Sequence, residues 1–161
     1  MVTKEIKIAF EEYSGINELN QTDMVLCQEA VKAMENSHSP YSKFKVGVAI
    51  RLVSGKIIYG SNQENVAYPS GLCAERVALF HWGANYPNDP IESMAVTAYT
   101  NDFEILNPIT PCGSCLQVFA EYEKKQGKSF DILLYCKDGV VWKTHGIQSF
   151  LPFLFFEERL K

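Results

Sequence analysis

The sequence predicts an α/β protein, a three-layer α/β/α sandwich built as one domain over residues 1–161. Three observations lead to this prediction. Segments with the two-residue period of strands alternate with segments of helical period. Two short turn signals each separate a pair of strand-like runs. A length of 161 residues suits one hydrophobic core, and no linker or internal repeat divides the chain.

The chain opens with a loosely alternating segment, residues 4–13, which we expect to form a short leading strand. A helix then follows, capped by Asn20 or Thr22 and running to about Asn36, because its apolar residues recur at helical spacing. Pro40 stops this helix, since proline disfavours helical geometry in the residue before it.

The rest of the chain alternates between β-rich runs and helical patterns. Ser54-Gly55 and Asp138-Gly139 each separate two β-rich runs and are typical of hairpin turns. In chain order we expect a hairpin at 44–52 and 56–59, a helix at 73–85, a strand at 94–99, a helix at 112–125, a hairpin at 130–136 and 140–144, and a short helix near Ile147.

Composition argues against several kinds of partner. The formal net charge is -4 and the sequence pI is about 5.4, so the concentrated basic surface of a nucleic-acid-binding protein is not expected. The basic cluster of Lys124, Lys125 and Lys128 is assigned instead to the end of a helix. No stretch approaches the ~20 apolar residues of a membrane helix, and the first residues lack the apolar core of a signal peptide. We therefore expect a cytoplasmic protein with no nucleic-acid or membrane partner.

Two cysteine motifs carry the chemistry, Cys73-Ala74-Glu75-Arg76 and Pro111-Cys112-Gly113-Ser114-Cys115. Five cysteines is an odd number, and a Cys-x-x-Cys pair without an export signal favours metal binding over disulfides. A structural zinc site normally has four protein ligands, whereas a catalytic site has three and leaves a position for water. The three motif cysteines and the nearby glutamate therefore predict a catalytic zinc site with a proton carrier.

Both motifs stand where a helix is expected to begin. The free N–H groups and partial positive charge of a helix start stabilise thiolates. Cys112 and Cys115 are three residues apart, so they share one helix face. Arg76 is expected to donate hydrogen bonds to a thiolate and offset its charge, although a simple salt bridge is the alternative.

A structural zinc site remains the rival interpretation. Cys27 and Cys136 are expected to be core residues, but either could complete a closed four-cysteine site. Glu75 would then only complement a helix dipole, and the chain would be a zinc-stabilised interaction domain. The three histidines show no metal-binding spacing relative to the cysteines; they are His38, His81 and His145.

A cysteine with a glutamate two residues on, followed later by Pro-Cys-x-x-Cys, resembles the signature of the zinc-dependent base deaminases. The resemblance covers most of the chain and points to the homotetrameric cytidine deaminases of free nucleosides. It extends to Tyr41-Ser-Lys-Phe-Lys-Val-Gly47, Asn62-Gln-Glu-Asn65, Tyr68-Pro69 and Leu151-Pro152 followed by Phe155. One departure is Leu116, which stands where the family usually has arginine.

This resemblance implies a cytidine-deaminase type of sandwich with a mixed sheet and one Zn²⁺ per subunit, held by Cys73, Cys112 and Cys115. A zinc-bound hydroxide would attack C4 of cytosine while Glu75 moves the protons. Cytidine and deoxycytidine would become uridine and deoxyuridine plus ammonia, in pyrimidine salvage. A deaminase of modified cytosine nucleosides is a second reading, and a polynucleotide deaminase is disfavoured because it would need a basic groove.

The resemblance also implies the substrate contacts. Asn62 and Glu64 match the pair that binds the ribose 3′-hydroxyl, and Phe44 matches a wall of the base pocket. The apolar segment 150–156 favours a subunit interface, with packing in the chain's own core as the alternative. In a homotetramer, two aromatic residues would act across subunits; they are Tyr68 and Phe155.

Overall fold

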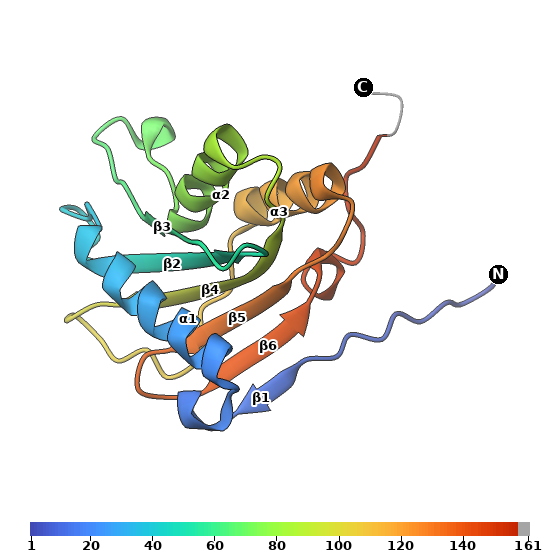
Figure 1. Ribbon diagram of the computed structural model, residues 1–161, viewed down its shortest axis with the longest axis horizontal. Helices are drawn as coiled ribbons and strands as arrows, with labels where there is room; N and C mark the ends of the chain where they lie inside the picture. Colours follow the sequence, from blue (N-terminus) through green and yellow to red (C-terminus); the bar gives the residue numbers. More distant parts are fainter. Residues whose placement is uncertain (158–161) are drawn as a thin grey trace.

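The computed structural model describes residues 1–157, whose strands form one six-stranded sheet. The strands are β1 (Glu11–Tyr13), β2 (Lys45–Leu52), β3 (Ile57–Ser61), β4 (Ile91–Tyr99), β5 (Asp131–Cys136) and β6 (Val141–His145). They lie in the order β1-β6-β5-β4-β2-β3 (Figure 1). β4 and β5 run parallel and the other neighbours run antiparallel, so the sheet is mixed, as the resemblance implies.

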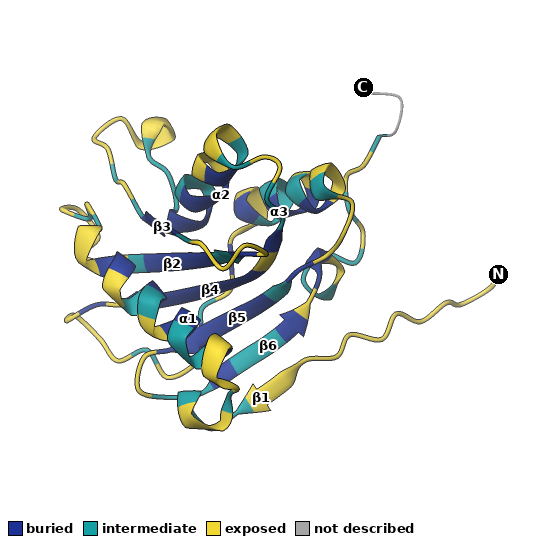
Figure 2. Ribbon diagram, in the orientation of Figure 1, coloured by how far each residue is buried: buried dark blue, intermediate teal, exposed yellow. Residues whose placement is uncertain are grey.

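Helices cover both faces of this sheet. α1 (Gln21–Ala33) packs on one face, while α2 (Ala74–Asn85) and α3 (Gly113–Gln126) pack on the other. Along β2, Val48 and Ile50 contact the layer of α2 and α3, whereas Ala49 between them contacts α1. Figure 2 shows that the buried residues lie in the strands and in the helix faces turned toward them. The predicted three-layer α/β/α sandwich is confirmed.

The first helix begins and ends close to its predicted bounds. Asn20 is its N-cap, and its side-chain oxygen accepts the N–H of Asp23 at 2.9 Å. The α-helix ends at Ala33, and a 3₁₀ turn over Met34–Asn36 completes the predicted length.

Among the described residues, no helix combines the length and hydropathy needed to cross a membrane.

The predicted leading strand is wrong over most of its length. Only Glu11–Tyr13 of residues 4–13 pair with β6, whereas residues 1–10 are exposed and belong to no strand. The length of β6 explains this for residues 4–8, because β6 ends at His145, two residues beyond the partner of Glu11, and offers them no partner. We call residues 1–10 the N-terminal arm; it extends away from the sheet (Figure 1).

The start of α2 lies in close contact with β3 at Gly60. A Cβ atom on Gly60 would lie 2.4 Å from the carbonyl oxygen of Ala74 and 2.7 Å from the backbone nitrogen of Ala78. Only glycine therefore fits at this position without a shift of the helix. Because Ala74 directly follows Cys73, this contact sets the height of the first cysteine motif above the sheet.

A buried carboxylate near the end of α3 holds the segment that follows β6. Glu123 accepts the N–H of Ile147 at 3.2 Å and the N–H of Phe130 at 3.4 Å. The hydroxyl of Ser129 donates to the same carboxylate at 3.2 Å. The 3₁₀ turn Ile147–Ser149 is thereby attached to α3.

Beyond this turn, the apolar C-terminal segment divides into two sets of side chains. Phe150, Leu151 and Leu154 pack partly against the core. Phe153 and Phe155 are 83% and 74% exposed. Packing within the chain's own core therefore accounts for the first set only, and the second set remains available to another surface.

We expect Gly60→Ala to lower the free energy of unfolding by about 2 kcal/mol, because the new methyl group overlaps the backbone of α2. Urea unfolding of the purified variant measures this change. Gly15→Ala is the matched control, since a Cβ on Gly15 has no atom within 4 Å and its φ of -178° is extended. It should change stability by less than about 0.5 kcal/mol. Equal effects of the two substitutions would contradict the role assigned to Gly60.

Candidate active site

Both cysteine motifs lie at helix starts, as the sequence predicts. Cys73 is the N-cap of α2, and Cys112 is the N-cap of α3, each with extended backbone dihedral angles. Cys115 lies in the first turn of α3. The three side chains therefore meet where the unpaired N–H groups and partial positive charges of two helices converge. This environment stabilises negative charge on sulfur.

The three sulfur atoms form a cluster that fits one metal ion. Cys73 Sγ lies 4.0 Å from Cys112 Sγ, which lies 3.5 Å from Cys115 Sγ, and all three atoms are within 4.8 Å of one another. Zinc–sulfur bonds of about 2.3 Å in tetrahedral geometry place sulfurs about 3.8 Å apart. The cysteines are not joined by disulfides. The donor set and its spacing therefore suit Zn²⁺.

The other two cysteines are absent from this cluster. Cys27 packs between α1 and the sheet, on the opposite face, and burial raises the pKa of its thiol to about 12. Cys136 donates from Sγ to the carbonyl oxygen of Ile105 at 2.9 Å. Both are buried core residues, as predicted. Within residues 1–157, which contain all five cysteines, only three cysteine sulfurs therefore come together.

The cluster shares its protons unequally. Hydrogen bonding with the Cys115 thiol, followed by hydrogen bonds from Arg76 and Cys112, lowers the pKa of Cys73 well below its usual value. The same bond to Cys73, together with burial, raises the pKa of Cys115. One thiolate thus forms readily while its buried neighbour keeps a proton. A divalent cation would favour loss of the remaining protons.

Glu75 is a buried carboxyl group beside the cluster, on the first turn of α2. Its side chain is 5% exposed. Burial is the main cause that raises its pKa, and the charge of Cys73 raises it further. A raised pKa makes this carboxyl group a better proton acceptor than an ordinary glutamate, as a proton carrier requires.

Arg76 lies next to the cluster, with its Nη2 atom 4.0 Å from Cys73 Sγ. This contact agrees with the predicted hydrogen bond to a thiolate, and the structure gives Arg76 no carboxylate partner within salt-bridge distance among the described residues. Its Nε atom is buried and has no hydrogen-bond partner. The guanidinium group of Arg76 therefore faces the sulfur atom of Cys73.

A cavity of about 570 Å³ opens beside Cys73, between the segment after β3 and the start of α2. Predicted substrate contacts and cluster neighbours share its wall. The lining residues are Tyr41, Ser42, Asn62, Gln63, Glu64, Asn65, Tyr68, Gly71, Leu72, Cys73 and Arg76. The rings of Tyr41 and Tyr68 meet edge to face, with centroids 6.4 Å apart. Such a volume suits a small molecule with a few convergent polar groups.

Asn62 and Glu64 also hold this wall together. The Asn62 amide donates to the carbonyl oxygen of Phe44 at 2.8 Å and accepts the N–H of Val46 at 2.8 Å. Glu64 accepts the N–H of Tyr41 at 3.0 Å, the N–H of Ser42 and the Ser42 hydroxyl. Desolvation opposes ionisation of Glu64, but these hydrogen bonds lower its pKa. The carboxylate is therefore ionised and keeps lone pairs for a further donor.

Two predicted contacts do not line this cavity. Phe44 is half-buried and stacks on Phe103, with ring centroids 6.1 Å apart and planes inclined by 23°. Nothing in the sequence pattern indicated Phe103, because the loop that carries it lies far along the chain. Phe155 lies against α3, where its carbonyl oxygen accepts from Gln117 at 3.2 Å.

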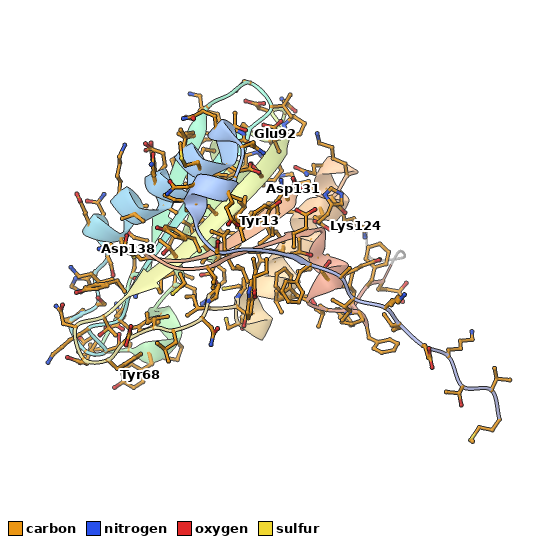
Figure 3. All side chains as sticks on the ribbon, turned by 90° about the horizontal axis from the view of Figure 1, so that it is seen from below. Tyr13, Tyr68, Glu92, Lys124, Asp131 and Asp138 are labelled. Atoms are coloured by element: carbon orange, nitrogen blue, oxygen red, sulfur yellow. The ribbon has the colours of Figure 1, made fainter. Side chains whose placement is uncertain are left out.

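The end of the described chain lies far from the cavity. Lys124, whose Nζ lies 4.1 Å above the ring centroid of Phe156, is at the opposite side of the molecule from Tyr68 (Figure 3). Phe155 therefore does not reach the cavity of its own chain. Lys124 and Lys125 occupy the last turn of α3, which agrees with the assignment of this basic cluster to a helix end.

Residues 20–127 match a protein-family model described as the cytidine and deoxycytidylate deaminase zinc-binding region. The chain belongs to the cytidine deaminase family. This confirms the family predicted from the cysteine motifs and places the chain among zinc hydrolases. The sulfur cluster lies within the matched region.

Some known proteins resemble this chain in sequence, and some solved structures resemble it in fold. The cytidine deaminase of Halalkalibacterium halodurans is 41% identical over 97 residues, covering 60% of this chain and 69% of that protein. The probable cytidine deaminase of Dictyostelium discoideum is 30% identical over 143 residues, covering 88% and 90%. The crystal structure of the cytidine deaminase from Burkholderia pseudomallei superposes with a TM-score of 0.70 at 36% identity, covering 81% of this chain and 97% of that one.

We expect Cys112→Ser to lower zinc affinity by more than about 100-fold, since even removal of groups that only orient ligands costs 10–100-fold. Competition with a chromophoric chelator measures this affinity. Cys27→Ala should bind zinc like the unsubstituted protein, because Cys27 lies on the other side of the sheet. Zinc loss in Cys27→Ala, or its retention in Cys112→Ser, would contradict the assignment of the ligands.

Proposed function

We propose that this chain catalyses the hydrolytic deamination of cytidine and deoxycytidine to uridine and deoxyuridine with release of ammonia. The observation that supports it most is the buried Glu75 carboxyl group beside three clustered cysteines. A purely structural zinc site has no use for a buried acid with a raised pKa. Membership of the cytidine deaminase family supports the same reaction.

Cys73, Cys112 and Cys115 would hold the zinc ion. When bound, zinc supplies Lewis-acid chemistry that makes water acidic and nucleophilic at neutral pH. Glu75 accepts a proton from the attacking water and delivers it to N3 of the cytosine ring. It then takes the proton of the new C4 hydroxyl group and passes it to the amine at C4, so that the C4–N bond breaks, C4 becomes a carbonyl carbon and ammonia leaves. The charge of Arg76 offsets that of the thiolates and keeps the site from becoming too negative.

Asn62 and Glu64 are proposed to bind the ribose 3′-hydroxyl. This hydroxyl donates its proton to the Glu64 carboxylate, and the Asn62 amide completes the contact. Their positions on the wall of the cavity support the assignment. Phe44 would present its ring to the base, and its stacking on Phe103 would limit the orientations of that ring.

The wider context is proposed on the same basis. We propose one domain over residues 1–161 with one zinc ion per subunit, acting in cytoplasmic pyrimidine salvage. The exposed Phe153 and Phe155 support a contact between subunits, which we propose to be that of a homotetramer. In that assembly Phe155 and Tyr68, which is 78% exposed, would contribute to the site of a neighbouring subunit.

Glu75→Gln tests the proposed mechanism. We expect it to lower kcat for cytidine by roughly 10²–10⁴-fold, because the amide cannot carry the proton. Ammonia release gives the rate, and zinc content is measured in the same samples. Glu121→Gln makes the same substitution at an exposed position of α3 and should retain full activity.

Three outcomes separate the alternatives. Activity lost in a Glu75→Gln protein that keeps its zinc supports the hydrolytic reading. No turnover by the zinc-loaded unsubstituted protein would redirect the search to modified cytosine nucleosides. If those also fail, and zinc removal unfolds the chain, the structural-zinc reading replaces the proposal.

Glu64→Gln tests sugar recognition separately from chemistry. Loss of a hydrogen bond to a charged group should raise KM for cytidine by roughly 10–100-fold with a smaller change in kcat. For 3′-deoxycytidine, which lacks the hydroxyl, the same substitution should change KM little. Glu35→Gln on the surface is the control. An equal rise of KM for both nucleosides would show that Glu64 acts only by holding the turn at Tyr41 and Ser42.

A further inference from the structure

The N-terminal arm is an extended segment whose apolar side chains are uncovered. Residues 1–10 are exposed along their whole length (Figure 2). Ile6, Ile8 and Phe10 alternate with polar or small residues and are 55%, 51% and 56% exposed. Phe10 contacts Trp142, with ring centroids 5.3 Å apart. This alternation is typical of a strand with one face buried, but the contacts within the described residues leave each of these three side chains more than half exposed.

The arm continues an edge of the sheet. β1 is the outermost strand beside β6, and no described strand pairs with its other side. On the inner side, residues 6–9 share a cavity of about 240 Å³ with His145, Gln148, Ser149 and Pro152. The outer side is open. An exposed edge of this kind presents unpaired backbone N–H and C=O groups that can accept another strand.

Residues 7–11 are complementary to themselves in antiparallel orientation. Centred on Ala9, Lys7 lies opposite Glu11 of a second copy, and Ile8 lies opposite Phe10 of that copy. Because the two strands are identical, each pair occurs twice, with the roles of the two copies exchanged. The register therefore contains two pairs of opposite charge, two apolar pairs and no pair of like charge.

The neighbouring register is less favourable. Centred on Ile8, the same two strands place Lys4 opposite Glu12, but they also place Glu5 opposite Glu11, and this like-charge pair occurs twice. Directly opposed like charges destabilise paired strands. A shift by a single residue in one strand would instead place apolar residues opposite residues of the other face. Charge and face together favour the register centred on Ala9 over these two shifted registers.

We propose that the N-terminal arm forms an interface with a second copy of this chain, in which residues 5–13 of the two copies pair antiparallel about Ala9. The two six-stranded sheets then join edge to edge. Because β6 pairs only with Glu11–Tyr13, the two folded bodies lie at opposite ends of the paired segment and are staggered along it. The arm and β1 precede residues 20–127, so this contact lies outside the matched deaminase region.

Charge reversal tests the pairing in the full-length protein. Lys7→Glu converts both Lys–Glu pairs into Glu–Glu pairs and should weaken the arm-mediated association by roughly tenfold or more. Lys4→Glu changes the net charge equally, but Lys4 lies opposite the uncharged Ser14 in this register and its substitution should have little effect. Sedimentation equilibrium gives the association constants. Equal behaviour of all three proteins would overturn the proposal, even if the chain associates through another surface.

Cross-linking tests the register independently of affinity. Ala9→Cys places two thiols opposite each other, with Cβ atoms about 5 Å apart, so mild oxidation should produce a disulfide-linked dimer. Peptide mapping distinguishes the link between the two introduced cysteines from links through the native Cys112, which is exposed. Thr3→Cys is the control, because residue 3 does not meet itself in this register. Linkage through position 3 as rapid as through position 9 would contradict the paired arrangement.

Discussion

Three cysteines from two separate helices can share one ion because α2 lies in direct backbone contact with β3. The missing side chain at Gly60 allows the first turn of α2 to descend onto the sheet. Cys73 caps that turn, and the parallel strands β4 and β5 place the start of α3 beside it. The charge environment follows from the same arrangement, since two helix starts and Arg76 stabilise thiolate, while the depth of the site keeps Glu75 away from water.

The clustering of the three sulfur atoms could be predicted from the sequence because its determinants are local. A cysteine placed just before a helical pattern becomes an N-cap, and Cys112 and Cys115 three residues apart share a face. Glu75 follows from the same reasoning, because a residue in the first turn of a buried helix points inward with its neighbours. The hairpin turns at Gly55 and Asp138-Gly139 are equally local, since both Gly55 and Asp138 adopt positive φ angles.

Features that depend on contacts between distant segments could not be predicted. The stacking of Phe103 on Phe44 joins two loops whose approach is set by the whole sheet. The hydrogen bonds of Asn62 to Phe44 and Val46 exist because the end of β3 returns to the start of β2. The prediction of a leading strand over residues 4–13 was wrong for the same reason. Alternation in the sequence predicts a strand, but it does not give the length of the strand that lies beside it.

The bond between Glu123 and Ile147 has a consequence for the exposed C-terminal aromatic residues. It fixes the start of the C-terminal segment, and partial packing of Phe150, Leu151 and Leu154 against the core holds the segment further along. Phe155 follows Ile147 by eight residues, and eight extended residues span at most about 28 Å. Any surface that receives the Phe155 ring must lie within that radius of Ile147. Loss of the Glu123 hydrogen bonds would therefore move the point from which the Phe155 ring reaches any such surface, without changing the ring itself.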